Sequence, residues 1–282
     1  MLGRFRAQWA QRATRLGLLG VAASQHRGPV PDLSGTIEFE TSFGTLHLDE
    51  DDPVITAGLV AVGEWEPGET ALLGAHLRPG MTVLDIGAHV GYYAVLAGRL
   101  VGPRGLVVAF EPSPRNFELL LVNVWRNGLT NVVCLPWAAS DRSGFASLHL
   151  ARANTGDHRI YPLDEPRETV AVRAAALDDV AALKPPVDVV KIDVQGAEEA
   201  VVRGAERLLA ASPNVLATVE FGPRELTAYG SEPRTLLAYY RSLGFLLRVQ
   251  HPERRGIEEL TDDEILAECE GGTHVNLVLT RS

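Results

Sequence analysis

Short runs of apolar residues alternate with segments of helical spacing from about residue 66 to the end of the chain. Most of the runs are continuous, which is typical of strands that are covered on both faces. The order of strand and helix predicts a doubly wound α/β domain with a mostly parallel sheet, helices on both faces and right-handed crossovers. The predicted strands are Thr82 to Ile86, Leu106 to Phe110, Val132 to Pro136, Val187 to Val194, Val215 to Phe221, Phe245 to Gln250 and His274 to Thr280. The predicted helices are Glu66 to Leu77, Gly91 to Leu100, Pro114 to Asn127, Ala197 to Ala211 and Pro233 to Leu243.

Polar and apolar residues alternate strictly in two other places. Residues 35–63 contain such alternation around a Ser42-Phe43-Gly44 turn, which predicts a small β hairpin. The long connection between Cys134 and Val187 shows the same pattern, and we expect an inserted hairpin there.

The opening stretch carries five arginines before the first acidic residue, Asp32. A short apolar run, interrupted by glycine, lies between the fourth and the fifth of these arginines. This run is far shorter than the roughly 18 residues of a membrane span, so we expect neither a span nor a signal peptide. A mobile or docking helix is the prediction, with binding to a membrane surface or a partner as alternatives. The chain is therefore divided into an N-terminal extension of a helix and a β hairpin, residues 1–63, and the α/β domain, residues 64–282.

Charge and cysteine content exclude several classes of function. The formal net charge is −10, and a negative chain lacks the field that attracts phosphates, so we expect no nucleic-acid partner. Cys134 and Cys269 lie far apart and form no ligand cluster, which argues against structural zinc and a disulfide scaffold. Because no diagnostic metal spacing is found either, we expect a metal-independent, cytoplasmic protein.

A glycine-containing turn follows the first predicted strand of the domain. The sequence from Val83 runs through Asp85, Gly87 and Gly91 into a helix, and ligands of open α/β sheets bind at such strand ends. Glycine also lets a ligand approach the backbone closely. A dinucleotide site would read GxGxxG and bind pyrophosphate, but Asp85 replaces the first glycine and suits a cationic ligand. The alternative is that Asp85 only caps the turn.

The ends of the next strands carry further polar residues. Glu111 follows the second strand, where a carboxylate accepts hydrogen bonds from both ribose hydroxyls, unless it is merely solvated. We expect the third strand to end at Ala139 and Ser140, from which backbone amides and a hydroxyl reach an adenine edge. On the fourth strand, Lys191 and Asp193 point to the same face, either as functional groups or as an ion pair that orders the loop.

These motifs together resemble the FkbM family of methyltransferases, over roughly Glu64 to the C-terminus. The resemblance implies a Rossmann-like class I methyltransferase fold with a seven-stranded sheet, S-adenosylmethionine as cofactor, and O-methylation of a hydroxyl on a natural product or sugar, as in antibiotic biosynthesis. The motifs are Asp85-Ile86-Gly87-Ala88 with Gly91-Tyr92, Phe110-Glu111-Pro112, Ala139-Ser140-Asp141, Leu177-Asp178-Asp179, and Lys191-Ile192-Asp193-Val194 with Gly196-Ala197-Glu198. The predicted cofactor-binding residues are Asp85, Gly87, Ala88, Gly91, Tyr92, Glu111, Pro112, Ser113, Ala139, Ser140 and Asp193.

One position departs from the family pattern: Gln195 stands where the family usually has glutamate. If that carboxylate is a base or a metal ligand in relatives, its role passes here to Asp193, a histidine or water. Gln195 retains the ability to orient an acceptor hydroxyl by hydrogen bonding.

Methyl transfer from a sulfonium requires alignment of the acceptor and, where needed, removal of its proton. The candidate catalytic residues are Asp193, His158, His89 and Glu220, with Asn154, Asp157 and His274 as further polar groups on the acceptor side. The sequence does not assign the base among them, and for each histidine an ordinary structural role is the alternative. The expected partner is a small hydroxylated acceptor, and a homo-oligomer is compatible with the sequence.

Two other functions remain open at this point. A non-catalytic protein that binds S-adenosylmethionine or a partner would keep the cofactor side and lose the acceptor side, and Gln195 gives this alternative some weight. An NAD-dependent oxidoreductase shares the acidic residue after the second strand, but the missing GxGxxG turn argues against it.

Overall fold

The computed structural model describes residues 32–180, 183–250 and 256–281. The predicted N-terminal helix lies outside the described residues. Within them, no helix combines the length and apolar character that crossing a membrane requires.

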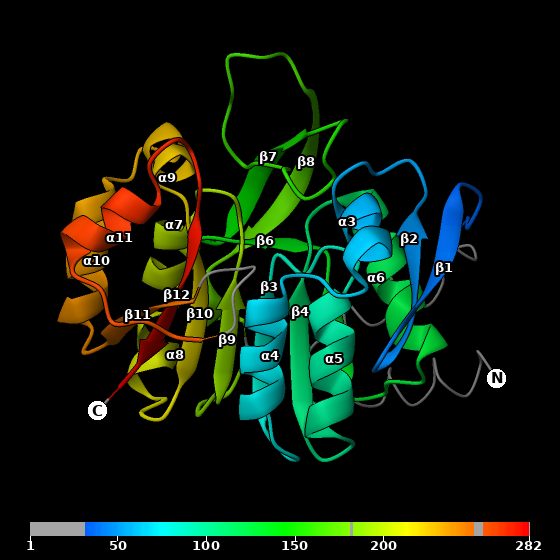
Figure 1. Ribbon diagram of the computed structural model, residues 1–282, viewed down its shortest axis with the longest axis horizontal. Coiled ribbons are helices and arrows are strands. Elements are labelled where there is room, and N and C mark those ends of the chain that lie inside the picture. Colours follow the sequence, from blue (N-terminus) through cyan, green and yellow to red (C-terminus); the bar gives the residue numbers. More distant parts are fainter. Residues whose placement is uncertain (1–31, 181–182, 251–255, 282) are drawn as a thin grey trace.

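The largest sheet has seven strands in the order β11-β12-β10-β9-β3-β4-β5 (Figure 1). Strands β3, β4, β5, β9 and β10 are parallel, and β12 runs antiparallel to both of its neighbours. This confirms the predicted doubly wound α/β domain. The strands are β3 (Thr82–Ile86), β4 (Leu106–Phe110), β5 (Val132–Leu135), β9 (Val189–Ile192), β10 (Leu216–Phe221), β11 (Leu246–Gln250) and β12 (Val275–Thr280).

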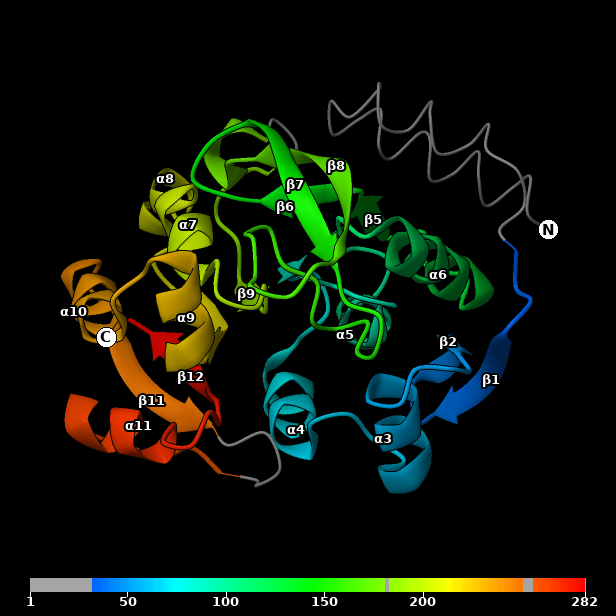
Figure 2. The ribbon, with the colours of Figure 1, turned by 90° about the horizontal axis from the view of Figure 1, so that it is seen from above.

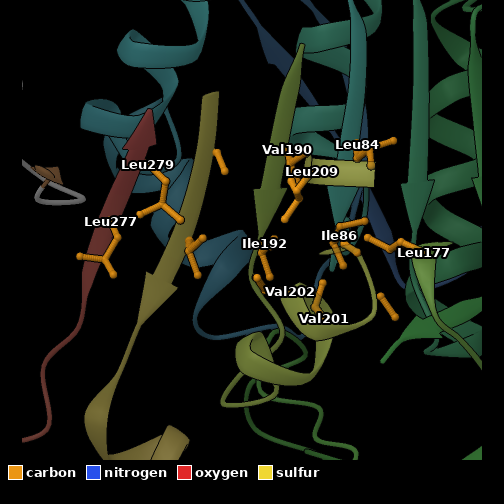
Figure 3. Close-up of a cluster of buried hydrophobic side chains, with 14 of the residues drawn as sticks. Leu84, Ile86, Leu177, Val190, Ile192, Val201, Val202, Leu209, Leu277 and Leu279 are labelled. Atoms are coloured by element: carbon orange, nitrogen blue, oxygen red, sulfur yellow. The ribbon is translucent and has the colours of Figure 1, made fainter. Parts of the chain in front are cut away.

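Helices cover both faces of this sheet. One buried cluster joins one face to α4 (Pro67–His76), α5 (Tyr92–Val101) and α6 (Pro114–Arg126). The other face packs on the second group of helices, and Figure 3 shows Leu84, Val190 and Val201 from that cluster. Because β3 sends Val83 to one cluster and Leu84 to the other, the continuous apolar run is explained by burial on both sides. The second group is α7 (Glu198–Arg203), α8 (Glu206–Ala210), α9 (Pro223–Tyr229), α10 (Pro233–Ser242) and α11 (Asp262–Glu268).

The predicted N-terminal hairpin is present as β1 (Thr36–Thr41) and β2 (Gly44–Asp49), and β2 lies against α6 (Figures 1 and 2). Asn123 of α6 fixes it: its Oδ1 accepts the N–H of His47 at 2.6 Å, and its Nδ2 donates to the His47 carbonyl at 3.0 Å. Leu46 and Leu48 are fully buried in the core that α5 and α6 share. The hairpin therefore packs on α6 and shares its core. The division of the chain at residue 63 stays a prediction.

The structure differs from the predicted elements at several points. Residues 55–62 form helix α3 (Ile55–Val62) instead of continuing the alternation, and the helix predicted over residues 197–211 is two helices. The interruption falls at Gly204, where an added Cβ would lie 2.0 Å from the Ser140 carbonyl oxygen, so the chain passes too closely for any side chain. Helices α9 and α11, of seven residues each, were not predicted.

The prediction that the third strand ends at Ala139 and Ser140 is wrong. Strand β5 ends at Leu135, and after Pro136 the chain enters β6 (Trp137–Ala139), which belongs to a separate sheet. There β6 pairs in parallel with β8 (Glu168–Ala175), and β8 pairs antiparallel with β7 (Gly144–Leu150). Strands β7 and β8 are the inserted hairpin that the sequence predicted. Figure 1 shows this hairpin standing above the ends of the central strands.

Candidate cofactor and acceptor site

A cavity of about 420 Å³ opens at the carboxyl ends of β3, β4, β9 and β10. Most of its lining comes from three parts of the chain, the strand ends, the segment around α3, and the loop that connects β7 to β8, with further residues from α5, α6, β6 and the segment before β12. The strand ends contribute Gly87 to Val90, Phe110 to Pro112, Lys191, Asp193 to Gln195 and Glu220; the other two parts contribute Val54, Ile55, Leu59, Trp65, Glu66 and Asn154 to Ile160.

The turn after β3 is held in the left-handed backbone region, with φ of 83° at Gly87, 52° at His89 and 90° at Gly91. A Cβ at Gly87 would lie 1.8 Å from the Asp193 carbonyl oxygen, and one at Gly91 would lie 2.6 Å from Cδ1 of Leu120. Gly87 is therefore required by the close approach of the turn to the end of β9, whereas at Gly91 the left-handed backbone favours glycine, because the Leu120 side chain can shift. Gly87 also lines the cavity, whereas Gly91 does not.

Glu111 is held rigidly at the end of β4. It is 5% exposed, and its two oxygens accept the backbone N–H groups of His89 and Ser113, each at 2.8 Å. Burial raises the pKa of Glu111 to about 7, although these two amides oppose the shift. A carboxylate has about four acceptor positions, so Glu111 keeps capacity for two further donors on the cavity wall.

Asp85 is a buried carboxylate, 2% exposed, and neither of its oxygens has a hydrogen-bond partner among the described residues. Burial raises its pKa to about 7, and the charge of Lys191, its register partner on β9, opposes the shift. Asp85 does not line the cavity, and neither do Gly91, Ser113 and Ser140. The other predicted cofactor-binding residues do line it: Gly87, Ala88, Tyr92, Glu111, Pro112, Ala139 and Asp193.

A polar network crosses the ends of β9 and β10. Lys191 Nζ lies 3.1 Å from Oδ2 of Asp193, and Gln195 Nε2 donates to Oδ1 of Asp193 at 2.8 Å and to Oε2 of Glu220 at 2.6 Å. Although burial opposes it, the Lys191 charge lowers the pKa of Asp193, whereas burial and the Asp193 charge raise the pKa of Glu220 well above its usual value. Asp193 is thus the ionised member and Glu220 the protonated one, with the Gln195 amide between them.

The turn that carries Gln195 is itself fixed. Gln195 has a φ of 55°, and the Oε1 atom of Glu198 accepts the N–H groups of Val194 and Gly196 at 3.2 and 3.0 Å. The Tyr161 hydroxyl donates to the Gln195 carbonyl at 2.9 Å. The backbone that carries the Gln195 side chain is therefore fixed both by Glu198 and by the loop between β7 and β8.

His89 and His158 both line the cavity. Burial lowers the pKa of each imidazole to about 4, so both are neutral at pH 7. Nδ1 of His158 accepts the N–H of Ala151 at 3.0 Å, which places its proton on Nε2. His158 therefore presents a hydrogen-bond donor and not a basic lone pair.

All four candidate catalytic residues lie on one cavity, but sequence reasoning missed part of its wall. Glu66 lines it in a left-handed conformation, with φ of 38°, and burial raises its pKa to about 8. Residues 55–62, which form α3, were assigned to the N-terminal extension and Trp65 to the start of the domain, neither with a role in the site. The described residues contain no group of three histidine, cysteine, aspartate or glutamate side chains arranged to hold a metal ion.

A doubly wound sheet, a glycine turn without a pyrophosphate fingerprint and a fixed acidic residue after the second strand together define a Rossmann-like protein with a ligand site at its strand ends. Residues 85–247 match the family model described as the methyltransferase FkbM domain. The match spans more than half of the chain, and the chain belongs to this family. Its cofactor is S-adenosylmethionine.

Similarity to individual proteins is local. The protein-L-isoaspartate O-methyltransferase of Thermotoga maritima is 46% identical over 57 residues, which are 20% of this chain and 18% of that protein. A protein of the same name from Archaeoglobus fulgidus is 42% identical over 59 residues, 21% of this chain and 27% of that protein. The chain thus spans about a fifth to a quarter of the length of these relatives.

Among solved structures, methyltransferase FkbM from Methylobacillus flagellatus is 13% identical with a TM-score of 0.46, over 74% of this chain and 50% of that chain. TYW2 from M. jannaschii, in complex with AdoMet, has the same identity and TM-score over 90% of each chain.

Proposed function

We propose that this protein transfers the methyl group of S-adenosylmethionine to a hydroxyl of a small natural product or sugar. The observation that carries the proposal is one cavity with a fixed carboxylate, Glu111, and a polar network of Gln195, Asp193 and Glu220 at the neighbouring strand ends. The first group suits the cofactor and the second suits an acceptor.

The cofactor end fits residues that are already in place. Glu111 would accept hydrogen bonds from the two ribose hydroxyls, and Ala139 lies on the wall that would face the adenine. Asp85, beside the Gly87 turn, has no hydrogen-bond partner among the described residues and a pKa raised by burial, and a cationic ligand nearby would favour its ionised form. The cofactor supplies an electrophilic methyl group on a positively charged sulfur.

The charge of the cavity favours a neutral or cationic acceptor. Its lining contains the acidic residues Glu111, Asp157, Asp193 and Glu225, besides Glu66 and Glu220, whose pKa values burial raises, but only two formally cationic ones, Arg159 and Lys191. Arg159 is bound to Asp157 at 2.6 Å and Lys191 to Asp193 at 3.1 Å, so neither cation is free to receive an anion. A phosphate or carboxylate on the acceptor would therefore be repelled, which supports a sugar, amino sugar or polyol over a nucleic acid.

The test is a transfer assay with tritiated methyl donor against matched acceptors. A neutral sugar, the corresponding amino sugar and the corresponding uronic acid differ mainly in charge, and release of S-adenosylhomocysteine is measured for each. We expect turnover with the neutral or amino sugar class and none with the acid. A control variant, Glu165→Gln, should show the same acceptor preference as the wild type, because Glu165 is exposed and does not line the cavity.

Two outcomes would overturn the proposal. Turnover confined to carboxylate-bearing acceptors would refute the acceptor class. Tight cofactor binding without transfer to any hydroxylated acceptor would favour the non-catalytic alternative, in which the Gln195 amide closes the acceptor end by binding both carboxylates.

A further inference from the structure

A chain of hydrogen bonds joins three distant segments at the cavity wall. Asp52, in the loop before α3, accepts the hydroxyl proton of Thr155 and also the Thr155 N–H at 3.1 Å. Thr155, in the loop between β7 and β8, contacts Nε2 of His89 through its Oγ1 at 2.8 Å. His89 in turn belongs to the glycine turn, and its backbone N–H binds Glu111 at 2.8 Å.

The direction of each proton in this chain follows from Asp52. This carboxylate is 5% exposed, and its Oδ1 also accepts the N–H groups of Val54 and Ile55 at 2.8 and 2.7 Å. Although burial opposes it, these bonds and the Thr155 hydroxyl lower the pKa of Asp52, so it is ionised and accepts only. The single hydroxyl proton of Thr155 therefore goes to Asp52, and Oγ1 accepts from His89 Nε2.

The consequence is a defined tautomer of His89. Since the neutral imidazole carries its proton on Nε2, where it meets the Thr155 hydroxyl, Nδ1 keeps its lone pair. His158 has the opposite arrangement, with Nδ1 occupied by the Ala151 N–H. Of the two histidines, only His89 offers a basic nitrogen at the cavity.

We propose that Nδ1 of His89 is the base that receives the acceptor proton, and that Thr155 and Asp52 are positioning residues that fix this tautomer. The inference rests on the proposed function. The acceptor oxygen bonds to the methyl carbon while the carbon–sulfur bond breaks with its electron pair going to sulfur. The proton of the same oxygen passes to Nδ1 and leaves His89 as an imidazolium with Nε2 still bound to Thr155.

A weakly basic imidazole is sufficient for this step. As the oxygen gains the methyl group it becomes positively charged, and its proton becomes strongly acidic. The imidazolium that forms is stabilised by the negative charges of Asp52 and Asp193, both of which act on the ring, whereas a protonated His158 would oppose it. At neutral pH His158 is uncharged, so the balance favours proton acceptance.

The tautomer is tested by nitrogen-15 NMR of the full chain labelled at histidine, in which long-range proton correlations distinguish Nδ1 from Nε2. His89→Asn identifies the His89 signals, because asparagine tolerates the left-handed backbone of this position. We expect a neutral ring protonated at Nε2 at pH 7. Thr155→Val should give a mixture of tautomers, whereas Thr155→Ser, which restores the hydroxyl, should keep the wild-type pattern. A wild-type ring protonated at Nδ1, or an unchanged pattern in Thr155→Val, would overturn the inference.

Kinetics on an acceptor that the wild type methylates test the role of the base. We expect His89→Asn to lower kcat by a factor of about 10² or more with little change in cofactor Kd, and Thr155→Val to lower kcat by about tenfold with rescue by Thr155→Ser. A His89→Asn variant with wild-type kcat would overturn the base assignment. The NMR measurement needs no acceptor, so absence of turnover counts against the proposed function alone, while the spectra still decide on the hydrogen-bond chain.

Discussion

Replacing Gln195 with glutamate is the sharpest perturbation of the acceptor end. The Gln195 amide lies 2.8 Å from Asp193 and 2.6 Å from Glu220, so a glutamate there removes both hydrogen bonds and adds a third carboxyl group. A hydrogen bond to a charged group contributes about 2 kcal/mol and one to a neutral group about 1 kcal/mol, which together predict a loss of about 3 kcal/mol. For a chain of this length that corresponds to a fall in Tm of roughly 6–12 °C.

The pH dependence separates lost hydrogen bonds from added charge. Gln195→Met removes the amide without adding a carboxyl group, and the stability lost in this variant should vary little with pH. In Gln195→Glu the neighbouring carboxylates raise the pKa of the new group in the folded state, so the unfolded chain ionises first and stability falls as pH rises from about 5 to 8. Millimolar Mg²⁺ should restore part of the loss in Gln195→Glu only, because three carboxylates provide hard oxygen ligands.

The assay is thermal unfolding of wild type, Gln195→Glu and Gln195→Met at pH 5.5 and pH 8, with and without Mg²⁺. Equal Tm values for the two variants at pH 8, or a Gln195→Glu variant as stable as wild type, would refute the placement of this amide between two carboxylates.

Three further predictions concern the fold around the site. Gly87→Ala should lower Tm by at least about 10 °C, because the added Cβ would meet the Asp193 carbonyl. Gly63→Ala is the control: Gly63 has the same φ of 83° but open space around it, so this variant should lose only about 1 kcal/mol of stability. Similar losses of stability in the two variants would contradict the close approach. Asn123→Leu should cost about 3 kcal/mol in chemical unfolding, since it removes the two bonds to His47 that dock the hairpin and one to the Val90 carbonyl, and a loss below about 1 kcal/mol would contradict that role. The pKa values of His89 and His158, lowered by burial to about 4, mean that the unfolded chain binds more protons between pH 6.5 and 4, so stability falls as pH falls through this window. Replacing both with asparagine should flatten that slope in unfolding titrations, and an unchanged slope would show that they titrate normally.

The sheet could be predicted because its strands are buried on both faces and appear as continuous apolar runs. Thr82 to Ile86 and Leu106 to Phe110 were predicted to the residue. The hairpins followed from strict alternation. Helix α3 was missed because its nearly uniform apolar sequence, from Ile55 to Val62, gives no clear helical face. The departure of β6 from the main sheet was missed because a sequence does not show which strand pairs with which.

The site was predictable where its residues follow strands and unpredictable where distant segments meet. Glu111 and Asp193 were found from their positions at strand ends, but the contact between Asp52 and Thr155 joins residues 103 positions apart. Sequence could name His89 and His158 as candidates but could not distinguish them. Their difference depends on which ring nitrogen is already occupied, and this is set by Thr155 and by the Ala151 backbone.

The central claim, that this cavity binds S-adenosylmethionine through Glu111, is tested most directly by isothermal titration of S-adenosylhomocysteine into the wild type, Glu111→Gln and Glu118→Gln. We predict one site per chain in the wild type. Glu111→Gln should bind about 100-fold more weakly, because two hydroxyl hydrogen bonds to a carboxylate at about 1.5 kcal/mol each are lost. Glu118 lies on α6, which follows Glu111 in the chain, and it is half exposed and does not line the cavity. Glu118→Gln therefore serves as the matched control and should bind with unchanged affinity. No binding by the wild type, or equal binding by a folded Glu111→Gln variant, would contradict the account.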